Sequence, residues 1–238
     1  FSRIQGTPDL MPSDITGTYV LEDGDGRRKF AFQKGPVFAN VVLMDEINRA
    51  TPKTQSALLE AMQEKQVTAG NTTFSLDRPF FVMATQNPIE QEGTYALPEA
   101  QSDRFIFKIK TDYPNEEEEV EIINRFTEEN RKVDELKPVI SKEDILTMQN
   151  LVRKVPVAND IKNYAVSIIN KTRKRKELIE YGASPRASIS LIMAAKARAL
   201  IEGRNYVDKE DIKEMMFPVL RHRIILNFEA ERKGMTTD

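Results

Sequence analysis

Short apolar runs, separated by longer amphipathic stretches, mark the first half of this 238-residue chain. Residues 41–44 and 80–84 are apolar without polar alternation, which is typical of strands covered on both faces, as in a parallel sheet. Residues 105–109 predict a third strand. Because helical patterns lie between these runs, we expect an α/β core over residues 1–112.

Amphipathic helical patterns dominate from residue 113 onward, and no strand is predicted there. An acidic first turn opens a helix over residues 115–131. Ser141 and Asp144 have the spacing of a capping box, with Asp144 in the place usually held by Glu or Gln. These patterns predict a small all-α domain over residues 113–238, with further helices at about 141–154, 159–174, 185–202 and 209–221.

Two turn signals interrupt the α/β part. The DGDG stretch at 23–26 separates residues 19–21 from 28–32, and the GN pair at 70–71 separates residues 66–69 from 72–76. Such Asp-Gly and Gly-Asn pairs favour tight turns between antiparallel strands. We therefore expect two β-hairpins inserted into the core.

Two adjacent carboxylates directly follow the first apolar run. Asp45 and Glu46 come after residues 41–44, and the carboxyl ends of strands in α/β sheets are where ligands bind. This is the pattern of a Walker B element, in which Asp45 would hold Mg²⁺ and Glu46 would polarise the attacking water. An Asp after a strand can also simply cap a following helix, so the pattern alone leaves both interpretations open. Two carboxylates are too few ligands for Mg²⁺, which would need nucleotide phosphates to complete its octahedral shell.

Two further polar side chains occupy positions suited to an anion. Asn87 follows the second apolar run, where it could orient a water or contact a γ-phosphate. Ser184 and Pro185 have the residue types of an N-cap and a first helical position. This places Arg186 in the first turn of a helix, where its side chain could point at an anion.

Four motifs, in this order, resemble the MoxR family of AAA+ ATPases: DEINRA at 45–50, ATQNP at 84–88, LPEAQSDRF at 97–105 and GASPRAS at 182–188. Residues 7–17 and 219–224 fit the same family, so the resemblance covers nearly the whole chain. It implies a AAA+ P-loop NTPase core with a helical lid, binding ATP and Mg²⁺. It also implies roles for five residues: Asp45 and Glu46 as Walker B, Asn87 as sensor 1, Arg104 as the arginine finger and Arg186 as sensor 2.

One family element is missing from these 238 residues. The Walker A loop, G-x-x-x-x-G-K-[ST], cradles phosphates and has no match in the chain. By resemblance, residues 2–5 correspond to the second core strand, so the parallel sheet would be N-terminally incomplete, and the strands at 80–84 and 105–109 would face an unfilled slot. We expect the natural protein to carry an upstream segment. Ala96 and Ser102 stand where the family commonly has Pro and Leu, and Ser102 adjoins the segment of the expected finger.

Composition narrows the function classes. The formal net charge is −2, which does not favour a nucleic-acid surface. The chain has no Cys, which fits a reducing compartment, and we expect a cytoplasmic protein. No apolar stretch approaches the ~18 residues of a membrane span. His222 is the only His, so a His-based metal site is not expected.

The resemblance implies an ATPase of the chaperone-like kind, which hydrolyses ATP at the subunit interfaces of a homo-oligomeric ring, expected to be a hexamer. It implies a protein client and a von Willebrand factor A domain partner, with the two hairpins as candidate contacts; exposed decoration is the other interpretation of the hairpins. Two alternatives stay open. A nucleotide-free adaptor would bind no nucleotide, and a nucleic-acid translocase would show steeply salt-dependent DNA binding.

Overall fold

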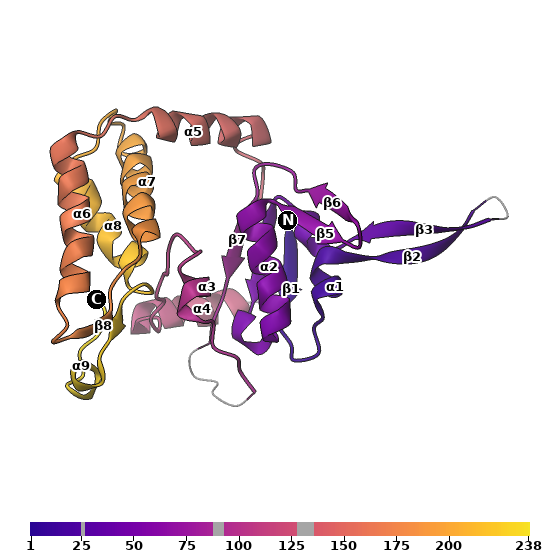
Figure 1. The fold of residues 1–238 in the computed structure, drawn as a ribbon, viewed down its shortest axis with the longest axis horizontal. Coiled ribbons are helices and arrows are strands. Elements are labelled where there is room, and N and C mark those ends of the chain that lie inside the picture. Colours follow the sequence, from indigo (N-terminus) through magenta and orange to yellow (C-terminus); the bar gives the residue numbers. More distant parts are fainter. Residues whose placement is uncertain (25–26, 88–92, 128–135) are drawn as a thin grey trace.

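The computed structural model describes residues 1–24, 27–87, 93–127 and 136–238. Figure 1 shows an α/β region that carries the N-terminus and a mainly helical region that carries the C-terminus. The hairpin β2–β3 projects from the α/β region on the side away from the helices α6, α7 and α8. Each region has its own hydrophobic core.

Three parallel strands form the central sheet, in the order β1-β4-β7. Their bounds are β1 (Ser2–Gln5), β4 (Val41–Asp45) and β7 (Phe81–Ala84). The helical elements of the same region are α1 (Pro12–Thr16), η1 (Pro36–Phe38), η2 (Ile47–Arg49), α2 (Pro52–Glu64) and α3 (Glu99–Ser102). The register pairs Gln5 with Asp45 and Met44 with Ala84. All three strands therefore end at the same edge of the sheet.

Two details of the predicted strands are wrong. In β4 only Val42 and Met44 are fully buried, whereas the alternate residues are half-buried, so the strand is not covered equally on both faces. Residues 105–109 form no strand, and β7 is left as an edge strand of the described sheet. Instead the Lys108 amide donates to the Pro218 carbonyl at 2.8 Å. Phe81 on β7 is 57% exposed, consistent with that edge.

Both predicted hairpins are confirmed, although residues 25 and 26 of the first turn lie outside the described part. They are β2 (Gly17–Gly24) with β3 (Arg27–Lys34), and β5 (Gln66–Ala69) with β6 (Thr72–Ser75), both antiparallel. Phe32 of the first hairpin stacks on Phe74 of the second, with ring centroids 4.2 Å apart. The two hairpins therefore contact each other at their bases.

The second region contains the predicted helices. They are α4 (Glu116–Thr127), α5 (Lys142–Lys154), α6 (Asn159–Lys174), α7 (Pro185–Ile201), α8 (Lys209–Leu220) and a short α9 (Phe228–Arg232). Ser141 and Asp144 make the predicted capping box at α5. The segment after α4 lies partly outside the described residues. One prediction is wrong: strands return as a short antiparallel pair, β8 (Ile179–Tyr181) and β9 (Ile225–Leu226). These strands join a chain segment after α6 to one after α8, a long-range pairing that sequence periodicity does not reveal.

A buried ion-pair cluster ties α7 to α8. The Asp211 side chain is fully buried, and it accepts from Arg198 at 2.9 Å and from Arg204 at 2.5 Å. Hydrogen bonds from Arg204 lower the pKa of Asp211 to about 2. Around the cluster, Leu191 and Ile212 are completely buried in the core of this region. The helices are thus held together by both apolar packing and paired charges.

Candidate functional site

Asp45 lies at the tip of the middle strand, between side chains from both neighbouring strands. Its Oδ2 accepts from Nη2 of Arg3 at 2.5 Å and from Nε at 3.1 Å, and its Oδ1 accepts from the Thr85 hydroxyl at 2.6 Å. The Thr85 hydrogen bond, and after it the one from Arg3, lower the pKa of Asp45 below its ordinary value. The group is therefore a carboxylate at neutral pH. Because Asp45 makes these contacts and caps no helix, the helix-cap interpretation is wrong.

Glu46 adopts a backbone conformation that residues other than glycine rarely adopt. Its φ is 53° and its ψ is 51°, in the left-handed region. A non-glycine residue there costs roughly 1–2 kcal/mol, and such strain gathers at functional sites. The conformation is held by the Glu46 amide, which donates to the Thr85 hydroxyl at 2.9 Å. The carboxylate accepts from Gln5 Nε2 at 3.0 Å and pairs with Arg49 at 3.2 Å.

Thr85 is the residue that joins the two acids, and no role was predicted for it. Its hydroxyl accepts from the Glu46 amide and donates to Asp45, so one oxygen fixes both neighbours. Its carbonyl accepts from the Ile47 amide at 3.0 Å. The available signal was position: Thr85 is the first polar residue after an apolar strand. Arg3 and Gln5, both on β1, were missed as well.

Asn87 lies two residues beyond Thr85, on the chain leaving β7. Its carbonyl accepts from the side-chain amide of Asn48 at 3.4 Å, and Asn48 is itself buried just after β4. The structure thus places Asn87 at the edge of the sheet that carries Asp45. Pro88, which follows it in the predicted motif, lies outside the described residues.

Arg104 lies away from this edge, on the turn after α3. It lines a cavity of about 410 Å³ with Gln101 and five residues of α2: Ser56, Leu59, Glu60, Gln63 and Glu64. Its Nε is buried and has no hydrogen-bond partner among the described residues. Asp45 is bonded to Arg3 and Thr85 and not to Arg104. The structure therefore does not bring Arg104 together with the two acids of its own chain.

Arg186 occupies the predicted first turn of α7. Ser184 is the N-cap, and its hydroxyl accepts from the Arg186 amide at 3.1 Å. The Arg186 guanidinium lies 3.5 Å from Oδ2 of Asp103, and its side chain is 52% exposed. Arg186 is thus paired with an acid of the DRF segment and, like Arg104, does not contact Asp45 in this structure.

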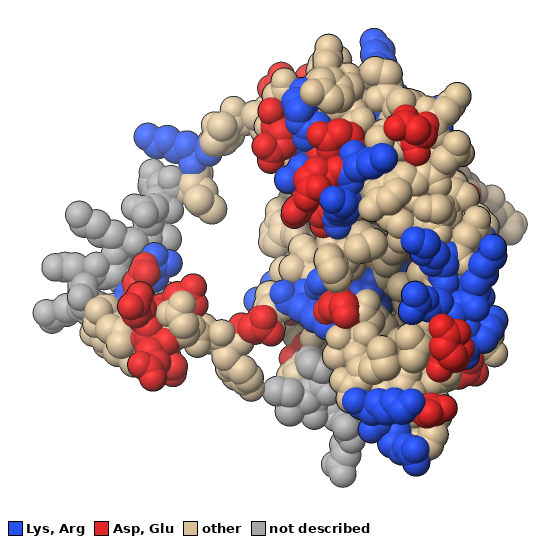
Figure 2. Space-filling model, turned by 90° about the vertical axis from the view of Figure 1, so that its left-hand side faces the viewer, with Lys and Arg blue, Asp and Glu red and all other residues tan. Residues whose placement is uncertain are grey.

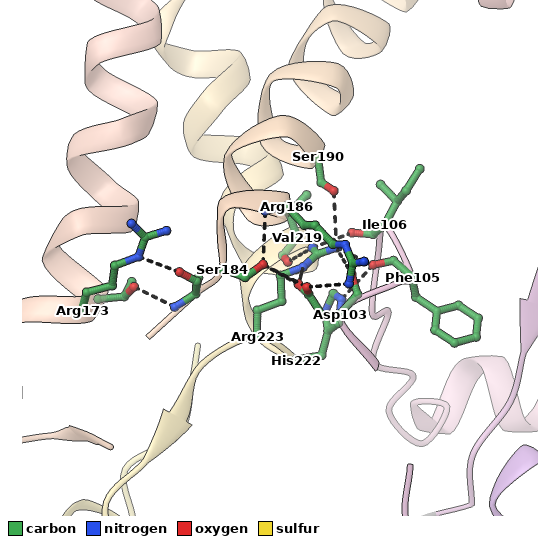
Figure 3. Close-up of polar contacts among 12 residues, drawn as sticks. Asp103, Phe105, Ile106, Arg173, Ser184, Arg186, Ser190, Val219, His222 and Arg223 are labelled. Carbon is green, nitrogen blue, oxygen red and sulfur yellow. Dashed lines mark hydrogen bonds and ion pairs between the residues drawn. The ribbon is translucent and has the colours of Figure 1, made fainter. Parts of the chain in front are cut away.

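A polar cluster around Asp103 joins the two regions. Figure 3 shows Asp103 among Ser184, Arg186 and Arg223. The Ser184 hydroxyl donates to Asp103 at 2.9 Å, and Nε of Arg223 donates to it at 2.8 Å. His222 contacts the Phe105 carbonyl at 3.0 Å, and burial lowers the pKa of His222 to about 4, so the ring is neutral at neutral pH. We refer to Asp103, Ser184, Arg186 and Arg223 as the Asp103 cluster.

The strand tips provide the kind of donors that Mg²⁺ prefers. Asp45 and Glu46 supply carboxylates and Thr85 a hydroxyl, all oxygens, as hard cations require. Among the described residues no three His, Cys, Asp or Glu side chains gather into a metal cage. These residues fit the Mg²⁺ ion and the γ-phosphate of a bound nucleotide. The Walker A motif, which would cradle the phosphates, is not in these 238 residues.

Comparison with known proteins identifies the family. Residues 1–107 match the family model of the ATPase family associated with various cellular activities (AAA), and residues 172–238 match the AAA lid domain. Protein MoxR of Methylorubrum extorquens is 31% identical over 263 residues; the alignment covers 100% of this chain and 75% of that protein. This chain belongs to the MoxR family of AAA+ ATPases.

Two further comparisons agree with this membership. Chaperone MoxR1 of Mycobacterium tuberculosis is 48% identical over 238 residues, covering 97% of this chain and 62% of that protein. A crystal structure of a protein from Cytophaga hutchinsonii, assigned as an ATPase, superimposes with a TM-score of 0.90 at 48% identity and covers 100% of this chain and 73% of that one. The MoxR fold with its AAA lid is therefore present here, as the motifs implied.

Proposed function

We propose that this MoxR-family chain is an ATPase that uses ATP with Mg²⁺, and that it supplies the residues that hold Mg²⁺ and activate the attacking water. The observation that carries the proposal is the pair Asp45–Glu46 at the tip of β4, with Thr85 fixing both residues through one hydroxyl. Adjacent acids held rigidly at the carboxyl end of a parallel strand are placed where α/β folds bind nucleotides. The strained backbone of Glu46 supports a functional rather than a structural role.

The residues at the strand tips would divide the work as follows. Bound Mg²⁺ would offset the negative charge of the β- and γ-phosphates. Asp45, kept ionised by its hydrogen bonds, would hold the cation through its shell, and Arg3 would have to release Oδ2. Glu46 would accept a proton from the attacking water, and Asn87 would orient that water. Thr85 would keep both carboxylates in place.

Arg104 would act in a neighbouring subunit. Because Arg104 makes no contact with Asp45 or Glu46 of its own chain, a role as an arginine finger needs a second copy. We therefore propose a homo-oligomeric ring, a hexamer, with sites shared between subunits. Arg186, in the first turn of α7, would reach the phosphates of its own subunit as sensor 2.

The proposed cellular role is chaperone-like remodelling of a protein client in the cytoplasm, together with a partner that has a von Willebrand factor A domain. MoxR1, a relative 48% identical, is named a chaperone, which supports this role. The β2–β3 hairpin presents exposed apolar side chains, Leu21 at 50% and Phe30 at 75%, and we propose it as a client contact. No helix among the described residues is long and apolar enough to cross a membrane.

The test is ATP turnover by the full-length natural protein over a series of protein concentrations. Turnover per subunit that rises with concentration is expected from sites shared between subunits. Mixing Arg104→Ala with Glu46→Gln subunits should then restore activity, because each intact interface needs Glu46 from one subunit and Arg104 from the other. Turnover that is absent at every concentration contradicts the proposal, and mixed subunits without recovery contradict the role of Arg104.

A nucleotide-free adaptor is the second candidate, and one observation favours it. Arg3 occupies the carboxylate oxygen of Asp45 that a cation would use. Titration with ATP separates the two proposals, since an adaptor binds none. A nucleic-acid translocase has less support: Figure 2 shows acidic side chains interspersed among Lys and Arg on the visible face, so that face has no continuous basic surface for a phosphate backbone.

A further inference from the structure

The segment that carries Arg104 is fastened to the lid by a buried arginine. The Arg223 side chain is 1% exposed. Its guanidinium donates to the carbonyls of Asp103 at 3.0 Å, Phe105 at 2.6 Å and Ile106 at 3.1 Å, and also to the Val219 carbonyl. The planar fork of arginine suits this set of acceptors, and lysine could not satisfy it. Arg104 is therefore flanked in the chain by Asp103 and Phe105, whose carbonyls are both hydrogen-bonded to the lid residue Arg223.

Two more contacts extend this fastening, while one side chain ties the segment to the core. His222 contacts the Phe105 carbonyl at 3.0 Å, and the Lys108 amide donates to Pro218 at 2.8 Å. The Phe105 ring, in contrast, packs against the hydrophobic core of the α/β region. A change in the angle between lid and core would therefore act on the residues beside Arg104.

Asp103 pairs with two arginines, one buried and one half-exposed. Its Oδ1 is 2.8 Å from the buried Arg223, whereas its Oδ2 is 3.5 Å from the half-exposed Arg186. Burial, and to a smaller extent the nearby charge of Arg186, lowers the pKa of Arg223, whereas Asp103 raises it. One carboxylate cannot neutralise both cations, and the exposed, longer contact is the weaker one. Arg186 can leave Asp103 without breaking the bond to Arg223.

We propose that Asp103 is a positioning residue that links Arg186 to Arg104. In the nucleotide-free protein Arg186 is paired with Asp103; when a phosphate binds, Arg186 pairs with the phosphate instead, and Asp103 stays paired with Arg223. The lid then loses the Arg186–Asp103 ion pair to residues 103–106, and this loss changes the position of Arg104. This inference rests on the proposed function, because it needs a phosphate for Arg186 and a role for Arg104.

The first test measures the dissociation constant for a fluorescent ATP analogue in full-length wild-type protein and Asp103→Asn. The amide cannot pair with the Arg186 cation, so the analogue should bind about two- to fivefold more tightly, the scale of an exposed ion pair. ATP turnover should fall, because the Arg104 segment loses its charged anchor. A residue that only supports the fold would weaken binding and turnover together, which would overturn the inference.

A double variant and a control sharpen this test. Asp103→Asn combined with Arg186→Ala should lose the tighter binding, because the gain depends on a released Arg186. Glu210→Gln is the matched control: it removes an exposed lid carboxylate paired with Lys213 at 3.1 Å and should change neither quantity. Tighter binding that persists in the double variant would contradict the link to Arg186.

A second measurement needs no nucleotide. In Arg223→Lys the charge stays but the hydrogen-bonded fork is lost, so the amides of residues 104–108 should exchange hydrogen about tenfold faster while the interior of α7 stays protected. Unchanged exchange would overturn the fastening of Arg104 to the lid. A wild-type protein that binds no ATP overturns the proposed function and this inference with it; a wild-type protein that binds and hydrolyses ATP, with unaltered binding in Asp103→Asn, overturns the inference alone.

Discussion

Asp45 and Asp211 are both kept ionised by their partners, yet their surroundings are opposite. Asp211 is fully buried in the lid, where Arg198 and Arg204 close around it. Asp45 lies at a sheet edge, and its partner Arg3 has a side chain that is 62% exposed. A carboxylate enclosed with its cations holds helices together, whereas one whose cation can swing into solvent stays available to a ligand. Changes at the strand tips should therefore alter chemistry, and changes at Asp211 should alter stability.

The largest effect is expected for Glu46→Gln. The amide keeps the size and polarity of the side chain but cannot accept a proton, so ATP turnover should fall by about 10²–10⁴-fold, the usual contribution of a general base. Nucleotide binding and the melting temperature should stay near wild type. Measuring turnover, affinity and thermal unfolding on one preparation checks all three. Lost binding would mean that Glu46 has a structural role.

Asp211→Asn should have the opposite profile. It removes the charge between Arg198 and Arg204 and should lower the free energy of unfolding by about 2–3 kcal/mol, below the range for fully buried pairs because both arginines reach solvent. Nucleotide affinity per folded molecule should be unchanged. Chemical denaturation, compared with Glu210→Gln, measures the effect. An unaltered unfolding free energy would show that the cluster contributes no stability.

The ion pairs of Asp211 also predict that the stability of the folded protein falls in acid. The pKa of Asp211 is about 2 in the folded protein against 3.8 for the free side chain, so its contribution is present above about pH 4 and is lost as the pH falls towards 2. Wild-type stability should therefore fall more steeply over this interval than that of Asp211→Asn. Denaturation curves at several pH values provide the comparison, and equal slopes would contradict it.

The smallest effect is expected for Thr85→Val, which keeps the shape and removes the hydroxyl. The Glu46 amide loses its acceptor, a change of about 1 kcal/mol in stability, and the pKa of Asp45 should rise towards its ordinary value. Because Thr85 positions both acids, kcat should fall while KM changes little. Thr73→Val, at an exposed position of β6, is the control. A raised KM with unchanged kcat would argue against a positioning role.

Local features of this fold could be predicted from the sequence because their partners are near in the chain. The capping box of Ser141 and Asp144 needs contacts only three residues apart, and the hairpin at Gly70 needs a turn and two short strands. The strand tip at Asp45 was equally accessible, since an apolar run determines where a strand ends. For the same reason the position of Arg186 in the first turn of α7 was predicted correctly.

Features that depend on distant partners could not be predicted this way. The bond between Asp103 and Arg223 spans 120 residues, and that between Arg3 and Asp45 spans 42. Residues 105–109 have the composition of a strand, but a strand exists only beside another, and these residues bond to the lid instead. The pairing of β8 with β9 likewise depends on how the helices bring two short segments together.

The stacked rings of Phe32 and Phe74 connect the β2–β3 hairpin to the β5–β6 hairpin. Their planes are only 11° from parallel, so a force that moves β2–β3 sideways also acts on β5–β6. The β5–β6 hairpin begins at Gln66, directly after α2 and Lys65, and α2 forms one wall of the cavity at Arg104. The β2–β3 hairpin is thus connected through Phe74, the β5–β6 hairpin and α2 to the cavity that Arg104 lines.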